Sequence, residues 1–130
     1  MERHNKSAME IAKFLEKRKD IKKVIYPGLK THPQHKLAAK QMNGFGGIVS
    51  FEIKGKLPKA KSFLKKTKIF TLAESLGGVE SLIEHPGLMT HASLSKERRE
   101  KLGISDTLIR LSIGLENIED LKEDITQALK

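Results

Sequence analysis

The chain has 130 residues, and its 25 lysines and arginines outnumber its 16 aspartates and glutamates, which gives a formal net charge of +9 at pH 7. A length of about 100–150 residues is typical of one domain, and 38% apolar with 32% charged residues exclude a wholly disordered or fibrous chain. Cysteine is absent, which excludes disulfides, thiolate zinc sites and a cysteine nucleophile. No apolar run approaches the roughly 20 residues that cross a bilayer, and the N-terminus lacks the apolar core of a secretory signal. We therefore expect a soluble, cytoplasmic, single-domain protein.

The positive charge is concentrated in the first half of the chain. Residues 1–68 carry 18 basic and 5 acidic side chains, whereas residues 69–130 carry 7 basic and 11 acidic ones. The densest stretch, Lys54–Lys68, has seven lysines and no acid. Such a run is typical either of a surface that binds nucleic acid or an acidic membrane, or of a solvated helix face. The absence of arginine and the helical spacing of the apolar residues favour the solvated helix face. These apolar residues are Leu57, Ala60, Phe63 and Leu64.

The first half of the chain predicts two helices and two strands ahead of this lysine-rich helix. An apolar stripe at helical spacing predicts a helix over residues 2–19. A short strand follows at Lys22–Tyr26 and ends at the turn Pro27–Gly28. Pro33 can begin a second helix, and the alternation of Val49–Ile53 predicts a half-buried strand. The residues expected on the inner face of the second helix are Leu37, Ala38 and Met42.

The second half of the chain is less regular. A short β-branched and aromatic run lies at Lys68–Leu72, and the segment Ala73–Pro86 shows no clear period. Ser95 can cap a helix that ends near Leu102. The alternation of Thr107–Ile113 predicts the clearest strand after Val49–Ile53.

The last predicted element is a helix that Asn117 can cap, with Asp120 three residues further on as in a capping box. The element order predicts an α+β fold in one domain, residues 1–130, with a small antiparallel or mixed sheet of about four strands covered by helices. A ferredoxin-like sheet or another α+β layer fits this order. The residues on the inner face of the last helix are Ile118, Leu121, Ile125 and Leu129.

Arg110 is the first candidate for a functional side chain. In the strand Thr107–Ile113 it shares a face with Leu108 and Ser112, opposite the apolar face. A guanidinium in mid-strand is costly to bury without an anionic partner, and its fork fits a carboxylate bidentately. The sequence leaves two interpretations of equal weight: a substrate-anchoring arginine, and an internal ion pair or exposed position.

The segment Glu74–Gly78 is the second candidate. Its paired glycines allow positive φ, so that backbone N–H groups can form a nest for an anion, although such a pair is more often a simple turn. The segment is neither a P-loop nor a dinucleotide-binding fingerprint. The histidines lack metal-ligand grouping and no serine stands in a nucleophile elbow, so we expect surface or capping histidines and no metal. These histidines are His32, His35, His85 and His91.

The motifs SLGGVESL, MTHAS and GISDTLIRLSIGLE resemble the C-terminal domain of the cystathionine γ-lyase and γ-synthase family. Members of this family are pyridoxal phosphate (PLP) enzymes of cysteine and methionine metabolism. The stretches ERHNKSAMEIAKFLE and VIYPGLKTHPQHKLAAKQMNGFGGIVSFEIKG match as well, so the resemblance covers essentially the whole chain. It implies the fold of the C-terminal domain of type I PLP-dependent enzymes and a role in transsulfuration chemistry at Cγ of amino acids.

The resemblance also implies substrate-binding roles for five residues. Arg110 would bind the α-carboxylate of the amino-acid substrate. Ser75 and the backbone of Leu76 would line the same pocket. Glu74 would reach the distal part of the substrate, and Thr90 would help to orient Arg110. An acid at position 74 resembles γ-lyases and γ-synthases, whereas β-lyases tend to carry an aromatic residue there.

The family's cofactor site is expected in a large N-terminal domain that these 130 residues do not contain. In family members that domain binds the phosphate, stacks on the pyridine ring and supplies the Schiff-base lysine in a Ser-x-Thr-Lys context. Thr67 and Lys68 imitate only part of that motif, because residue 65 is a lysine. The chain is therefore expected to be a fragment, a separately expressed domain or a remnant, with no catalytic residue and no bound PLP of its own.

The resemblance thus predicts the substrate-carboxylate-binding domain of a γ-lyase or γ-synthase and leaves these two activities open. The expected partners are cystathionine, cysteine or a homoserine ester, the chain's own N-terminal domain and further copies in a homotetramer, without nucleic acid or membrane. The alternative is a basic, non-enzymatic module that binds nucleic acid or another anion and loses affinity steeply with added salt. A self-associating regulatory domain is a third possibility.

We expect these 130 residues alone to have no PLP-dependent activity. PLP chemistry needs a lysine of lowered pKa, an acid at the ring nitrogen and a phosphate cradle. The check is to add PLP, record the absorption spectrum and assay turnover of cystathionine. A lysine-bound cofactor band together with robust turnover would contradict the prediction.

Overall fold

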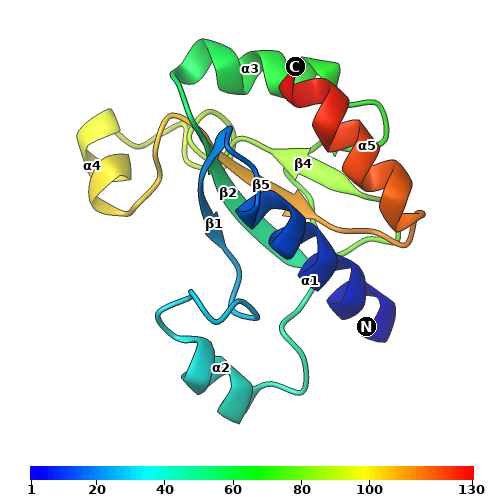
Figure 1. Cartoon of the computed structure of the whole chain (residues 1–130). Helices are drawn as coiled ribbons and strands as arrows, with labels where there is room; N and C mark the ends of the chain where they lie inside the picture. The colour runs from blue at the N-terminus through cyan, green and yellow to red at the C-terminus, as the bar shows by residue number, and fades with distance from the viewer.

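The computed structural model describes residues 1–130 and contains a five-stranded sheet with the order β1-β2-β5-β4-β3 (Figure 1). Neighbouring strands run antiparallel except β3 and β4, which are parallel. The predicted α+β class with a mixed sheet is confirmed, and β4 is the strand that the sequence did not predict. The strands are β1 (Ile21–Ile25), β2 (Ile48–Ile53), β3 (Thr71–Leu72), β4 (Leu82–Glu84) and β5 (Leu108–Ser112).

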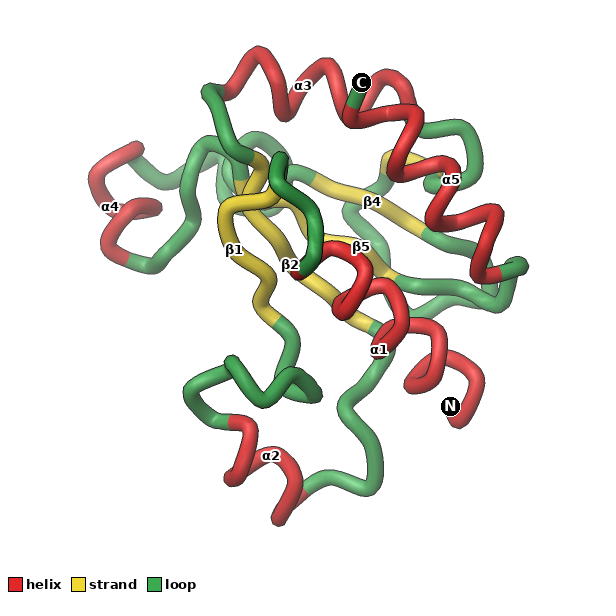
Figure 2. Tube along the Cα trace, in the orientation of Figure 1, coloured by secondary structure: helices red, strands yellow, loops and turns green.

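The longer helices form a layer on one face of this sheet. Helix α1 packs on β1 and β2 and against α5, and α5 also packs against α3 (Figures 1 and 2). Helices α2 and α4 lie at the periphery, away from this layer. No helix of the chain combines the length and the apolar character needed to cross a membrane. The helices are α1 (Glu2–Glu16), α2 (His35–Gln41), α3 (Leu57–Lys66), α4 (Lys96–Lys101) and α5 (Ile118–Leu129).

The main hydrophobic core lies between this helix layer and the sheet. Successive side chains of a strand point to opposite faces, so Phe51 of β2 and Ile109 and Leu111 of β5 are buried in the core. The same alternation places Ser50 and Arg110 on the other face. Helices α1, α3 and α5 cover one face only, and on the other face the connecting segment Glu74–Gly78 contacts Arg110 and Ser112.

Local sequence signals explain where four of the five helices lie. The Ser95 hydroxyl accepts the N–H of Arg98 at 3.3 Å and caps α4. The Asn117 side chain accepts the N–H of Glu119 at 2.9 Å and caps α5. In α3 Phe63 is buried while the lysines of the helix face outward, which confirms the solvated helix face. Helix α1 follows the predicted stripe but ends three residues earlier.

The expected inner face of α2 is largely wrong. Ala38 is buried, but Leu37 is 49% exposed and Met42 is 44% exposed. The helix begins at His35, two residues after Pro33, and has only seven residues. A helix of this length at the periphery buries one small side chain and leaves no partner for two large ones.

Asp124 fixes the chain between α3 and β3. It is buried on α5, and its carboxylate accepts the backbone N–H groups of Lys68 and Ile69 at 2.8 Å and of Phe70 at 3.1 Å. The amide of Gln127 donates to the same carboxylate at 2.9 Å. These bonds satisfy three successive N–H groups just before β3. Strand β3 is an edge strand of the sheet and leads into the segment Glu74–Gly78.

Replacement of Asp124 by alanine should lower the free energy of unfolding by about 2–3 kcal/mol, because buried N–H groups lose their acceptor. Urea unfolding of the 130-residue chain measures this loss. Glu123→Gln is the matched control, since Glu123 is an exposed neighbour on the same helix and should change the value by less than about 0.5 kcal/mol. Equal small effects of both variants would contradict the role of Asp124.

Candidate functional site

Three strands bring polar side chains together on the face opposite the helix layer. The register pairs Ser50 of β2 with Arg110 of β5, and Arg110 with Glu84 of β4. Directly opposed residues of neighbouring antiparallel strands have Cβ atoms about 5 Å apart, so long side chains meet. The sheet therefore places a guanidinium between a hydroxyl and a carboxylate.

Arg110 is held by two contacts. Its Nη1 lies 3.0 Å from Oε1 of Glu84, and its Nη2 donates to the backbone carbonyl of Glu74 at 3.1 Å. A guanidinium has five N–H donors, and its side chain is still 20% exposed here. The internal ion pair considered from the sequence is thus present. The group keeps both access to solvent and free donors, so the ion pair does not exclude a role in binding a carboxylate.

Glu84 is the partner that the sequence analysis missed. Its side chain is 1% exposed, and its Oε2 atom is buried without a hydrogen-bond partner. Burial raises the pKa of this carboxyl and outweighs the opposing attraction of Arg110. The signal in the sequence was weak, because Glu84 lies in the segment Ala73–Pro86, whose irregular pattern concealed the three-residue strand β4.

Thr90 reaches Arg110 only through Glu84. Its hydroxyl lies 3.5 Å from Oε1 of Glu84 and from the carbonyl of Pro86, and 2.9 Å from Nδ1 of His91. No hydrogen bond joins Thr90 directly to Arg110. The hydroxyl can therefore influence the guanidinium through the shared carboxylate.

The segment Glu74–Gly78 lies beside Arg110. Gly77 has a φ of +79° and donates its N–H to the Ser112 hydroxyl at 2.8 Å. Because Ser112 is two residues from Arg110 on the same face of β5, this bond holds the segment over the arginine. Ser75 and Leu76 lie between the two attachment points and are exposed, without a hydrogen bond to Arg110.

The end of this segment is tied to the chain that follows β5. The Ser81 N–H and hydroxyl both donate to the Glu116 carboxylate at 2.7 Å, and the Gly114 N–H donates to the Ser81 hydroxyl at 2.8 Å. A Cβ on Gly114 would lie 2.5 Å from the carbonyl oxygen of Val79. Only glycine allows this close approach, which explains the Ser-Ile-Gly-Leu-Glu stretch after Arg110 in structural terms.

The histidines take structural positions. His85 is buried and acts as a local cap, which is one of the two positions, surface or capping, that we expected for the histidines. Its Nδ1 accepts the N–H of Leu88 at 3.1 Å, and its Nε2 lies 2.9 Å from the carbonyl of Asp106. His35 stacks on Phe45 with a centroid distance of 5.4 Å. No group of three or more histidine, aspartate or glutamate side chains could hold a metal ion.

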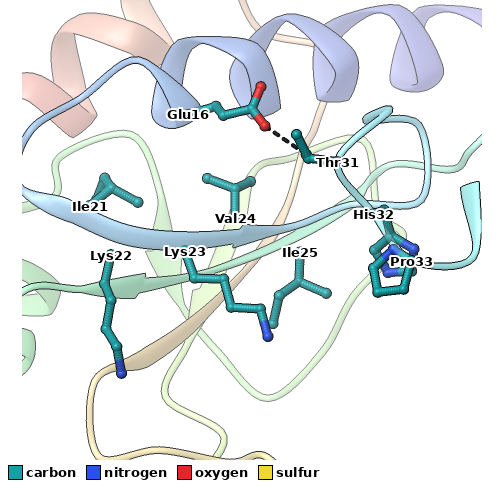
Figure 3. A pocket seen from close by; sticks show the side chains of 9 residues that line it. All are labelled: Glu16, Ile21, Lys22, Lys23, Val24, Ile25, Thr31, His32 and Pro33. Atoms are coloured by element: carbon teal, nitrogen blue, oxygen red, sulfur yellow. Dashed lines mark hydrogen bonds between the residues drawn. The ribbon is translucent and has the colours of Figure 1, made fainter.

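A separate cavity of about 340 Å³ lies at the opposite edge of the sheet, beside β1 (Figure 3). It includes Lys22 and Lys23 of the strand, and a hydrogen bond of 2.7 Å joins Thr31 to Glu16 in its wall. Figure 3 shows the two lysine side chains pointing away from that hydrogen bond. None of the residues proposed to bind substrate lines this cavity.

Residues 1–130 match the family model for Cys/Met metabolism PLP-dependent enzymes. The chain belongs to this family. It is 60% identical over 129 residues to a cystathionine γ-lyase of Dictyostelium discoideum, covering 99% of this chain and 33% of that protein. It is 61% identical over 130 residues to human cystathionine γ-lyase, covering 100% of this chain and 32% of that protein. A cystathionine β-lyase of Coxiella burnetii is 57% identical over 129 residues, which cover 99% of this chain and 33% of that protein. The chain thus spans about a third of the length of the curated relatives it matches.

The residues of this chain do not by themselves fit the cofactor of the family. Arg110 and Glu84 contact each other, the Glu74 carbonyl and the Thr90 hydroxyl, and no lysine is among these contacts. Lys68 is the residue that comes nearest to the family's lysine motif. It is exposed, and its backbone N–H donates to Asp124 of α5. What the site offers is a guanidinium fork that suits a carboxylate.

The free energy of unfolding should report the raised pKa of Glu84. The folded chain binds the proton of the Glu84 carboxyl more tightly than the unfolded chain does. Protonation of Glu84 therefore stabilises the fold fully at pH values below the ordinary pKa of 4.5, and this stabilisation is lost as the pH rises through the raised pKa. Glu84→Gln cannot titrate, so the variant does not lose stability from this group as the pH rises. The difference in unfolding free energy, variant minus wild type, should therefore increase between pH 4 and pH 8.

Urea unfolding at four or five pH values measures this difference. Glu80→Gln is the control, because Glu80 is an exposed acid of the neighbouring segment and its replacement should leave a difference that is flat with pH. A flat difference for Glu84→Gln as well would show that Glu84 titrates as an ordinary glutamate.

Proposed function

We propose that residues 1–130 form the C-terminal substrate-binding domain of a PLP-dependent cystathionine γ-lyase or γ-synthase, and that Arg110 binds the substrate α-carboxylate. The observation that carries the proposal is the guanidinium of Arg110, fixed by Glu84 and the Glu74 carbonyl yet accessible to solvent. Two parallel N–H···O bonds from such a fork suit a carboxylate. The names of the relatives from Dictyostelium and human supply the γ-lyase activity in this proposal.

The neighbouring residues receive roles from their positions. Glu74 contributes its backbone carbonyl to Arg110, which leaves its exposed carboxylate free for the distal part of the substrate. Ser75 and Leu76 form the wall between Glu74 and Gly77, and Thr90 helps to orient Arg110 through Glu84. These residues bind and position the substrate, and reactive groups come from elsewhere in the intact enzyme.

The exposed apolar residues around the segment support docking against another part of the enzyme. Leu72 is 53% exposed, Leu76 is 52% exposed and Val79 is 67% exposed. Exposed apolar side chains gathered near a site are typical of an interaction surface. We assign this surface to the enzyme's own N-terminal domain, which would bring PLP to the substrate. The intact protein in this proposal is a cytoplasmic homotetramer that acts on cystathionine, cysteine or a homoserine ester.

Arg110→Ala in the intact enzyme should raise KM for cystathionine about 10- to 100-fold, which corresponds to the loss of charge-assisted hydrogen bonds. The change in kcat should be smaller, because the arginine orients the substrate in both ground and transition state. Arg110→Lys should fall between wild type and alanine, since it keeps the charge and loses the fork.

Steady-state kinetics with purified enzyme test these values. Arg98→Ala is the matched control, because Arg98 is exposed on α4 and its side chain makes no ion pair or hydrogen bond. Unchanged KM and kcat in Arg110→Ala would refute the carboxylate-binding role.

A further inference from the structure

Glu84 forms an ion pair with Arg110 and is almost completely buried, with 1% of its side chain exposed. One of its oxygens, Oε1, contacts Arg110 at 3.0 Å and Thr90 at 3.5 Å. The other, Oε2, is buried and has no hydrogen-bond partner. An ionised carboxylate with an unpaired buried oxygen is costly, whereas the neutral acid carries a proton on that atom and reduces the cost.

A substrate carboxylate at Arg110 increases this cost. The guanidinium carries a single positive charge, which balances Glu84 as long as no other anion is present. A second carboxylate on the same guanidinium leaves one negative charge in excess in a partly buried place. Like charges that share a site favour the protonated form of one of them.

Three charged or titratable groups influence the charge of Glu84, in addition to the hydroxyl of Thr90. Arg110 comes from β5, Glu74 from the segment after β3 and His91 from the segment after β4. Ser50, the residue opposite Arg110 on β2, is uncharged. Glu74 is exposed and retains its water, so Glu84 is the acid that loses most by staying ionised.

We propose that Glu84 is a positioning residue that aims the guanidinium of Arg110 and takes up one proton when a substrate carboxylate binds there. This inference rests on the proposed function. The proton comes from solvent and forms an O–H bond at Oε2, while Oε1 continues to accept from Arg110. The charge then balances, with one guanidinium, one substrate carboxylate and one neutral acid.

The test uses butyrate, a carboxylate without an amine or a leaving group, as a competitive inhibitor of the intact enzyme between pH 5.5 and 8.5. In wild type, the inhibition constant should rise with pH, by up to tenfold per pH unit where binding takes up one proton. Glu84→Gln keeps an oxygen acceptor for Arg110 and cannot titrate, so its inhibition constant should vary less with pH and be lower than wild type at pH 8.5. Glu80→Gln should follow wild type.

Glu84→Ala distinguishes the positioning of Arg110 by Glu84 from the uptake of a proton by Glu84. It removes the acceptor that holds Nη1, so butyrate should bind more weakly than to Glu84→Gln at every pH, by about tenfold or more. A residue that only supported the fold would give similar butyrate affinity in both variants once they are folded. Identical inhibition constants for the two variants would overturn the positioning role.

One further measurement uses the wild-type enzyme alone. Calorimetry of butyrate binding in two buffers of different ionisation enthalpy counts the protons taken up, and the count should lie clearly above zero and at most near one. A count of zero throughout the pH range would overturn the proposal, as would a pH slope that persists in Glu84→Gln. If Arg110→Ala leaves the butyrate affinity unchanged, the proposed carboxylate-binding role of Arg110 is refuted, and the inference about Glu84 with it. If Arg110→Ala weakens butyrate but Glu84→Gln retains the slope, only the inference about Glu84 fails.

Discussion

The site depends on the alternation of side chains along β5, which runs through the middle of the sheet. Ile109 and Leu111 face the helix layer and belong to the core, so Arg110 between them must face the other way. A shift of the strand by one residue would bury the guanidinium under the helices and expose the core residues. The hydrophobic requirement of the fold therefore fixes the direction of its most important charge.

The charge then determines the surroundings. A guanidinium that is mostly withdrawn from water needs an anion, and β4 supplies Glu84 from the neighbouring position. The carbonyl of Glu74 takes a second N–H, which brings the following segment over the strand. The Ser112 hydroxyl holds that segment by accepting the N–H of Gly77, and the Ser81 hydroxyl accepts the N–H of Gly114 just beyond the segment. The proposed binding face thus consists of loops held by β5, while the helix layer supports the sheet from the other side.

The helices could be predicted because their signals are local. The serine before α4 and the asparagine before α5 cap their own helices, and the lysines of α3 lie on the side opposite the buried Phe63. Strand β4 could not be predicted, because a strand of only three residues is too short to show an alternating pattern in the sequence. The inner face expected for α2 failed because its neighbours in space, which the sequence does not show, leave most of that helix at the periphery.

The sequence by itself determined the fold class, the family resemblance and Arg110 as a candidate for binding a carboxylate. These depend on residue types and spacings within one stretch of chain. The tertiary structure decided that Arg110 has an internal partner, that this partner is Glu84 and that one of its oxygens is left without a hydrogen bond. Residues 84 and 110 meet only through strand pairing, and burial depends on every segment that covers them. The positive charge with which the sequence begins belongs largely to solvated lysines, whereas the functional proposal rests on a single arginine and the acid beside it.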